Sequence, residues 1–211
     1  MNPYLIRRPI GVNDDCVYLG CFDFEINFKK IKDLSNWNDR IRTYIIPSQD
    51  NADHPRPCIA IRTGNIRDDL IRTTYRMSAL AWENFNCTNP SLCFTMWWHR
   101  NDNPNLSDIL DTAEHCIKAL GMSHHLYFIT VHRHFFGGLC CNVVINRLHP
   151  ITYKIKRIRG INAKLDYAAR ECEIKFGWKP DEYGLHQVVV DSDNQKVIIP
   201  ARSANDDKNQ S

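Results

Sequence analysis

The residues best placed to do chemistry lie in the stretch 131–150, VHRHFFGGLCCNVVINRLHP. Its glycine pair permits the positive φ angles of a hairpin turn, so the stretch predicts two paired strands. Alternation along the second strand places Cys140 and Asn142 on one face. With His132 or His134 from the first strand, they could form a small metal-binding cluster. Asparagine is a weak ligand for transition metals. The same spacing therefore also fits cysteines that only fill space in a core.

The flanking sequence predicts the elements that must position this hairpin. Apolar periodicity, with Ser35 and Asn65 as N-caps, indicates helices over 35–45, 65–81, 106–121 and 162–177. Aromatic and β-branched content indicates strands over 92–98, 125–132 and 139–146, with a last hairpin over 188–199 adding two edge strands. We therefore expect an α+β fold in which helices cover one face of an antiparallel β-sheet and the other face is free to hold a site.

Length and composition fit one globular domain. The chain has 211 residues, of which 43% are hydrophobic, and we expect a single domain over 1–202 followed by a disordered polar tail over 203–211. The polar, proline-bearing stretch 47–57 is predicted to be a loop. Because 27 basic residues face 24 acidic ones, the net charge of +3 is small, and any nucleic-acid binding must rest on local charge.

The sequence predicts a cytoplasmic protein without membrane contact. No apolar run approaches the length of a bilayer span, and the N-terminus lacks the apolar core of a signal peptide. The nine cysteines are scattered without a CxxC pair, which favours buried thiols in a reducing compartment over a zinc ribbon.

The stretch 120–150 resembles the third motif of conjugative relaxases of the plasmid mobilisation type, the MobA/VirD2-like tyrosine nickases of the HUH endonuclease class. That motif has a leucine-glycine helix end, a strand, a His-x-Asp turn, His-x-His on the next strand, and Asn-Arg-x-His-Pro. Leu120-Gly121, Val131-His132 and 146-NRLHP-150 match it. Similar elements precede and follow in the same order, so the resemblance covers roughly 29 to 180 and implies a relaxase-like sandwich.

Members of this family cut one DNA strand with a tyrosine that becomes linked to the 5′ end. A metal held by histidines polarises the scissile phosphate. The resemblance implies that Tyr44, in 37-WNDRIRTYI-45, is the candidate nucleophile. Without the resemblance, a helical tyrosine is more often a packing residue.

The departures from the family pattern fall on its metal ligands. The corresponding positions here are Cys93, His132, Cys140 and Asn142, and the aspartate of the turn is lost. A thiol and an amide in place of imidazoles should abolish Mg²⁺ or Mn²⁺ binding of the family kind. Cys93 and Cys140 with a histidine could instead form a softer zinc site. We favour space-filling cysteines and expect no cofactor, because Asn142 would add little to a zinc site.

Local charge supports contact with DNA. The segment after the hairpin is basic and interleaved with apolar residues, and its candidate DNA-binding residues are Arg147, Lys154, Lys156, Arg157, Arg159 and Lys164. A solvated basic edge that blocks aggregation is the alternative. Trp97 and Trp98 could stack on bases, although at least one of them is expected to be in the core.

The leading hypothesis is a relaxase-like protein of conjugation or mobilisation that has lost metal-dependent nicking and binds single-stranded or origin-of-transfer DNA. It would work with an intact relaxase or other relaxosome proteins in a bacterium, encoded on a mobile element. The second hypothesis is a divergent nickase that uses Tyr44, with Mg²⁺, Mn²⁺ or Zn²⁺ only if the altered site still binds metal. The third is a protein-interaction module that kept only the fold.

Overall fold

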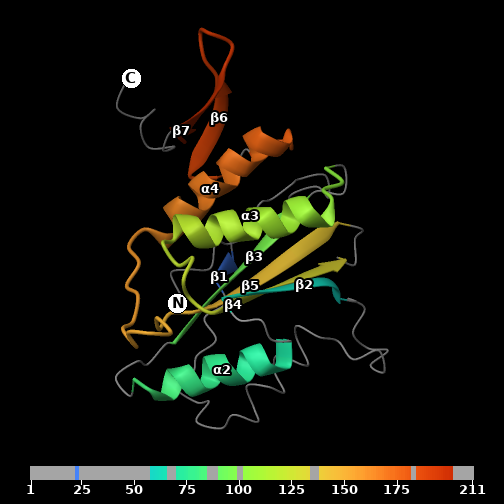
Figure 1. The fold of residues 1–211 in the computed structure, drawn as a ribbon. Helices are drawn as coiled ribbons and strands as arrows, with labels where there is room; N and C mark the ends of the chain where they lie inside the picture. The colour runs from blue at the N-terminus through green and yellow to red at the C-terminus, as the bar shows by residue number, and fades with distance from the viewer. Residues whose placement is uncertain are drawn as a thin grey trace, which may run out of the picture.

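The computed structural model of the chain describes residues 22–23, 58–65, 70–84, 90–98, 102–133, 138–181 and 184–201 (Figure 1). The elements in chain order are β1 (Phe22–Asp23), β2 (Cys58–Gly64), α2 (Leu70–Trp82), β3 (Ser91–Trp98), α3 (Leu106–Ala119), β4 (Tyr127–Arg133), β5 (Leu139–Asn146), α4 (Ile161–Phe176), β6 (His186–Val190) and β7 (Lys196–Pro200). The predicted helix over 35–45, the predicted loop over 47–57, His134 and the tail over 203–211 lie outside the described residues.

Five strands form one antiparallel sheet in the order β1-β3-β5-β4-β2. The predicted pairing of β4 with β5 is confirmed. The edge strand β2 was not predicted. Arg62 of β2 forms ion pairs with Asp111 and Glu114 of α3 at 3.1 and 3.2 Å. A Cβ at Gly64 would overlap the ring of its partner Tyr127, so the glycine lets this ring lie over the end of β2.

The hydrophobic core lies between this sheet and the helices α3 and α4. Alternate residues of the three central strands point into it, among them Phe94, Ile129 and Val143. The side chain of Asn105 accepts a hydrogen bond from the Asp108 backbone at 2.8 Å and caps α3. The predicted α+β sandwich of an antiparallel sheet packed with helices is confirmed.

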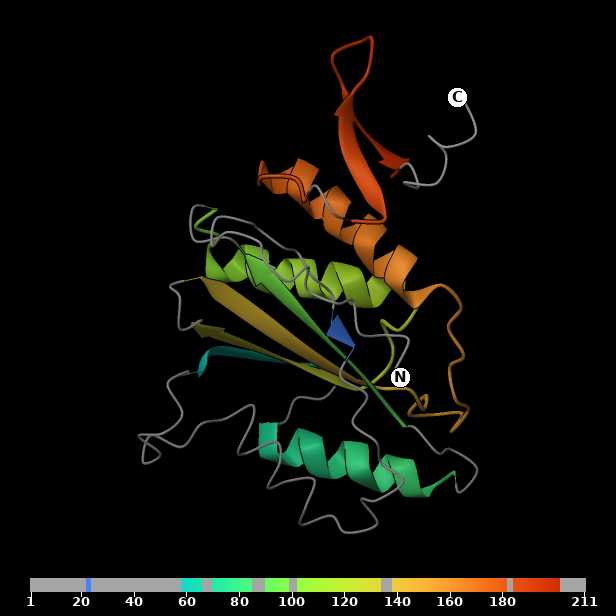
Figure 2. The same cartoon turned by 180° about the vertical axis from the view of Figure 1, so that it is seen from behind.

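The expectation that helices cover only one face of the sheet was wrong. Figures 1 and 2 show α2 on the opposite side of the sheet from α3 and α4. Thr73, Met77 and Leu80 are buried and follow one another at helical spacing, so α2 has an apolar stripe that needs a surface to cover. The face left for a site is therefore shared with α2.

Asn65 does not have the geometry predicted for an N-cap. Its φ of 61° is left-handed, whereas an N-cap is extended, and its amide nitrogen donates to the carbonyls of Ser123 and His125, both at 2.7 Å. The described part of the helix begins at Leu70. Asn65 thus ties the end of β2 to the turn before β4.

The last two strands were expected to add to the edge of the main sheet, and this expectation was wrong. β6 and β7 pair only with each other among the described strands and form a separate two-stranded sheet. They follow α4 and project from it away from the main sheet (Figure 2). Asp166 of α4 fixes the start of β6, accepting from the backbone nitrogen and Nδ1 of His186, both at 2.8 Å.

A buried charged cluster completes the link between α4 and the hairpin. Arg170 is fully buried, binds Glu173 Oε1 at 2.8 Å and donates to the Asp181 carbonyl at 2.9 Å. Burial raises the pKa of Glu173 to about 8, against the opposing effect of Arg170. Near neutral pH the folded protein therefore holds a proton on Glu173 that the unfolded chain releases.

That proton predicts an unusual pH dependence of stability. The pKa of Glu173 is about 8 in the folded state and near 4.5 when unfolded, so the free energy of unfolding should fall as the pH rises between these values. Glu173→Gln should remove this contribution, and its advantage over wild type should grow from acid to alkaline pH. Urea denaturation across that range measures the slopes, with the exposed Glu171→Gln as control. Parallel slopes for wild type and Glu173→Gln would contradict the assignment.

Candidate functional site

The four degenerate ligand positions all lie on the face of the sheet that α2 shares. Alternation puts Phe94 and Val143 in the core with α3, so their neighbours Cys93 and Asn142 point to the opposite face. The same alternation places Cys140 and His132 there. The prediction that Cys140 and Asn142 share one side of their strand is therefore confirmed.

Strand register brings part of this set into one row across the sheet. Cys140 of β5 is opposite His132 of β4 on one side and Trp97 of β3 on the other. His132 is in turn opposite Cys58 of β2. His132 and Cys140 are each only 2% exposed. Cys58 was not singled out by the sequence analysis, because β2 itself was not predicted.

A second row centres on Asn142. Its neighbours across the sheet are Thr95 of β3 and Thr130 of β4. The hydroxyl of Thr95 donates to Asn142 Oδ1 at 2.7 Å, and Thr130 Oγ1 lies 3.1 Å from His132 Nε2. The amide oxygen that would have to replace an imidazole nitrogen as ligand is thus already hydrogen-bonded within the sheet.

The structure does not bring Cys93 to this cluster. Cys93 and Cys140 lie on adjacent strands, but Cys93 is opposite Val144, four residues along β5 from Cys140. At about 3.4 Å per residue, that offset is about 14 Å, too far for two ligands of one metal. Among the described residues, no group of three or more His, Cys, Asp or Glu side chains is arranged to hold a metal ion.

Among the described residues, the two rows offer one imidazole, two thiols and a hydrogen-bonded amide. Mg²⁺ prefers oxygen ligands, so this donor set suits it poorly. Burial raises the pKa of the neighbouring Cys58 thiol. The arrangement favours a packed sheet surface over a metal centre.

The Asn-Arg-x-His-Pro segment joins this face to α2. The side chain of Asn146 donates to the Met77 carbonyl of α2 at 2.8 Å and accepts from the Leu148 backbone at 2.9 Å. The Asn146 carbonyl accepts from Nδ1 of the buried His125 at 2.9 Å. Burial lowers the pKa of His125, and the ring of His149 lies edge-on to it at 5.4 Å.

Residues 147–156 form a closed loop at the end of β5, which we call the basic loop. Its ends are held by backbone hydrogen bonds between Arg147 and Lys156 and between His149 and Lys154, at 2.8 and 3.0 Å. The amide of Asn84, just after α2, donates to the Tyr153 carbonyl at 3.1 Å. The basic loop is therefore closed on itself and bonded to a residue just after the end of α2.

The candidate DNA-binding residues lie on the basic loop, on the segment that follows it and, for Lys164, on the first turn of α4. Lys154, Lys156, Arg157, Arg159 and Lys164 are exposed, and Arg147 is half-buried with its guanidinium bonded to the Lys156 carbonyl. Of the two indoles, Trp98 packs in the core against Trp178 with ring centroids 5.7 Å apart. Trp97 is half-buried and borders Cys140 on the site face. Tyr44 lies outside the described residues.

Comparison with protein families agrees with this architecture of an antiparallel sheet packed with helices. A family model described as relaxase, MobA/VirD2-like, nuclease domain matches residues 51–178. The chain belongs to this family of relaxase nuclease domains, which act on transfer-origin DNA in conjugation and mobilisation. No curated protein and no solved structure matches the chain. In the described part of the chain, no helix is long and apolar enough to cross a bilayer.

The joint at Asn146 gives a stability prediction. Asn146→Ala removes a fully buried amide and leaves the Met77 carbonyl and the Leu148 backbone without their partner. We expect a loss of about 1–3 kcal/mol in the free energy of unfolding. Urea denaturation measures it, with Thr152→Ala in the exposed part of the basic loop as control. Equal stabilities of the two variants would contradict the role given to Asn146.

Proposed function

We propose that this relaxase-family protein binds single-stranded or origin-of-transfer DNA in conjugation or mobilisation but no longer nicks it with a metal. The observation that carries the proposal is the contrast along β5. Asn146, which holds the family's Asn-Arg-x-His-Pro segment in place, is kept together with its hydrogen bonds. Cys140 and Asn142, at the ligand positions four to six residues away, have side chains unsuited to Mg²⁺ or Mn²⁺.

The electrostatics of the basic loop support retained DNA contact. The exposed lysines and arginines after Asn146 can neutralise successive phosphates. The loop that carries them is closed by its own backbone hydrogen bonds and is bonded to Asn146 of β5 and to Asn84, just after α2. Arg170, which follows in the sequence, does not contribute, since it is buried with Glu173 and Asp181. The DNA-binding surface in this proposal comprises Arg147, Lys154, Lys156, Arg157, Arg159 and Lys164.

A protein that binds transfer DNA without cutting it would act beside one that cuts. We infer that its partners are an intact relaxase or other relaxosome proteins, in the cytoplasm of a bacterium that carries the mobile element. In this role the protein needs no resident metal. Holding the displaced strand or assembling the complex requires only a basic, preformed surface.

DNA binding is tested by the salt dependence of affinity. Replacing Lys154, Lys156 and Arg157 by alanine should weaken binding to single-stranded DNA and reduce the slope of log affinity against log salt by roughly 2. Fluorescence anisotropy at several salt concentrations measures both. The matched control replaces the exposed Lys118, Lys175 and Lys196, with the same change in net charge and no expected effect on the slope. Salt-independent or absent binding by the wild type would contradict the proposal.

A divergent nickase is the second candidate, because His132 remains buried opposite Cys140, at a ligand position of the family's site. In that case Tyr44 would attack the scissile phosphate and stay linked to the 5′ end of the cut strand. The released 3′ end would carry the hydroxyl, so one phosphodiester bond is exchanged for another.

Nicking is tested by incubating the protein with a single-stranded transfer-origin oligonucleotide of its element and Mn²⁺, Mg²⁺ or Zn²⁺. We expect no covalent adduct on a denaturing gel. An adduct from wild type that is missing in Tyr44→Phe would replace the non-nicking proposal with the nickase. As a control for the ligand argument, Cys140→His combined with Asn142→His restores three imidazoles with His132. This variant should gain stabilisation by Mn²⁺ in thermal denaturation, whereas the wild type should not.

A further inference from the structure

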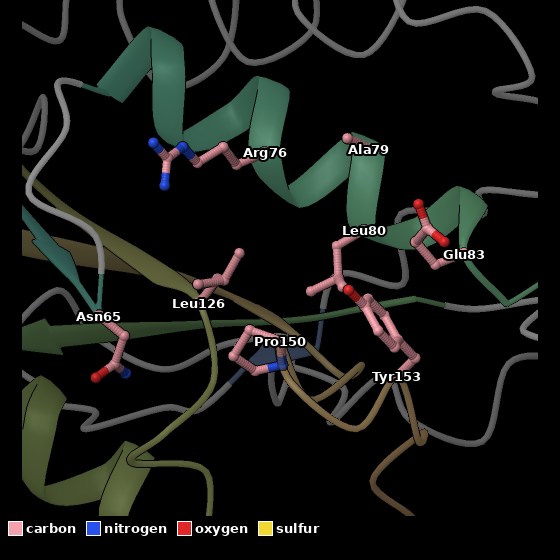
Figure 3. Close-up of a pocket in the computed structure, with 8 residues that line it drawn as sticks. All are labelled: Asn65, Arg76, Ala79, Leu80, Glu83, Leu126, Pro150 and Tyr153. Atoms are coloured by element: carbon pink, nitrogen blue, oxygen red, sulfur yellow. The ribbon is translucent and has the colours of Figure 1, made fainter.

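A hollow of about 320 Å³ lies between α2 and the basic loop (Figure 3). Arg76, Leu80 and Glu83 line it from α2, Leu126 lines it from the turn before β4, and Pro150 and Tyr153 line it from the basic loop. In the close-up, Leu126 and Pro150 lie across the hollow from α2, with Arg76 towards one end and Glu83 towards the other. Its lining includes no residue of the two rows centred on Cys140 and Asn142, and none of the proposed phosphate-binding residues.

The lining matches the chemistry of a nucleobase. Leu80, Leu126 and Pro150 give apolar walls, and Tyr153, 46% exposed, gives an aromatic ring that a planar base can stack against. A flat heterocycle buries its faces on such surfaces and needs few hydrogen bonds to do so. The guanidinium of Arg76 at one end carries the charge that an adjoining phosphate requires.

The hollow is held open by the joints already described. Asn146 binds the middle of α2 through the Met77 carbonyl, and Asn84 after α2 binds the Tyr153 carbonyl. Tyr153 itself has a left-handed φ of 55°, fixed by its backbone hydrogen bond to the His149 carbonyl at 2.9 Å. A tyrosine in that conformation is strained, and such strain tends to be kept at functional positions. Here the strained backbone presents the Tyr153 ring at the hollow.

The position of the hollow suits a bound strand. Exposed Lys154 follows Tyr153 directly, so the basic loop carries a positive charge beside the hollow. Glu83 at the far end disfavours a phosphate there, which leaves the Arg76 end for the backbone. Six residues of β5 separate Cys140 from Asn146, about 20 Å at 3.4 Å per residue. The hollow is thus remote from the former metal position.

We propose that this hollow receives one unstacked base of single-stranded DNA, stacked on Tyr153, while Arg76 contacts the phosphate beside that base. The inference rests on the proposed DNA binding and adds to it a contact that depends on the base itself. Phosphate contacts alone do not distinguish a strand with bases from one without them.

The test compares the full chain on two labelled probes of equal charge, an oligothymidylate of about 30 nucleotides and an abasic strand of the same length, both longer than one domain covers. Wild type should bind the oligothymidylate about tenfold more tightly than the abasic strand. Tyr153→Ala should remove most of that ratio with the abasic affinity unchanged, and Tyr153→Phe should retain it. Tyr167→Ala is the matched control, since Tyr167 is 44% exposed on α4.

A second variant keeps the result independent of the strained position. Ala79→Phe adds a ring to the lining from the exposed side of α2 and should lower the ratio as Tyr153→Ala does. If the wild type binds both probes with salt dependence but both variants keep its ratio, the base site is wrong and the DNA-binding proposal stands. If the wild type binds neither probe, the DNA-binding proposal fails, and the base site fails with it.

Discussion

The amide of Asn146 makes the contact on which the arrangement of this face depends. It lies at the last residue of β5, fully buried, and binds α2 through the Met77 carbonyl while it holds the Leu148 backbone. A buried amide that binds two backbone groups cannot move without leaving both unpaired, which is costly in an interior. The end of the central strand, the helix across the sheet and the start of the basic loop are therefore one rigid joint.

Much of the fold could be predicted from local pattern. The helices α3 and α4 and the strands β3, β4 and β5 are close to the expected ranges, because each has a strong periodicity bounded by caps or glycines. The strand β2 was not predicted, and Asn65 at its end was expected to cap a helix but instead binds the turn at Ser123 and His125. Periodicity also gave α2 an apolar stripe without indicating which face of the sheet it would cover.

At the site, the alternation of side chains along a strand predicts the face on which a residue lies but not its neighbours on the adjacent strands. The side of the sheet on which Cys140 and Asn142 lie follows from counting along the strand. Their neighbours across the sheet follow from register, which a single sequence does not contain. Only register shows that Thr95 binds the Asn142 oxygen and that Cys93 lies opposite Val144. Of the four positions grouped by the sequence, only His132 and Cys140 are direct neighbours across the sheet, whereas Asn142 and Cys93 have other partners.

The charged cluster on α4 has a consequence for where this domain can be divided. The family match ends at residue 178, yet the carbonyl and carboxylate that face Arg170 belong to Asp181, and Asp166 binds His186 at the start of β6. A fragment that stopped at the family boundary would leave α4 with a guanidinium and two carboxyls cut off from these partners. The hairpin over 186–200, although it stands apart from the main sheet, belongs to the smallest fragment that keeps α4 intact.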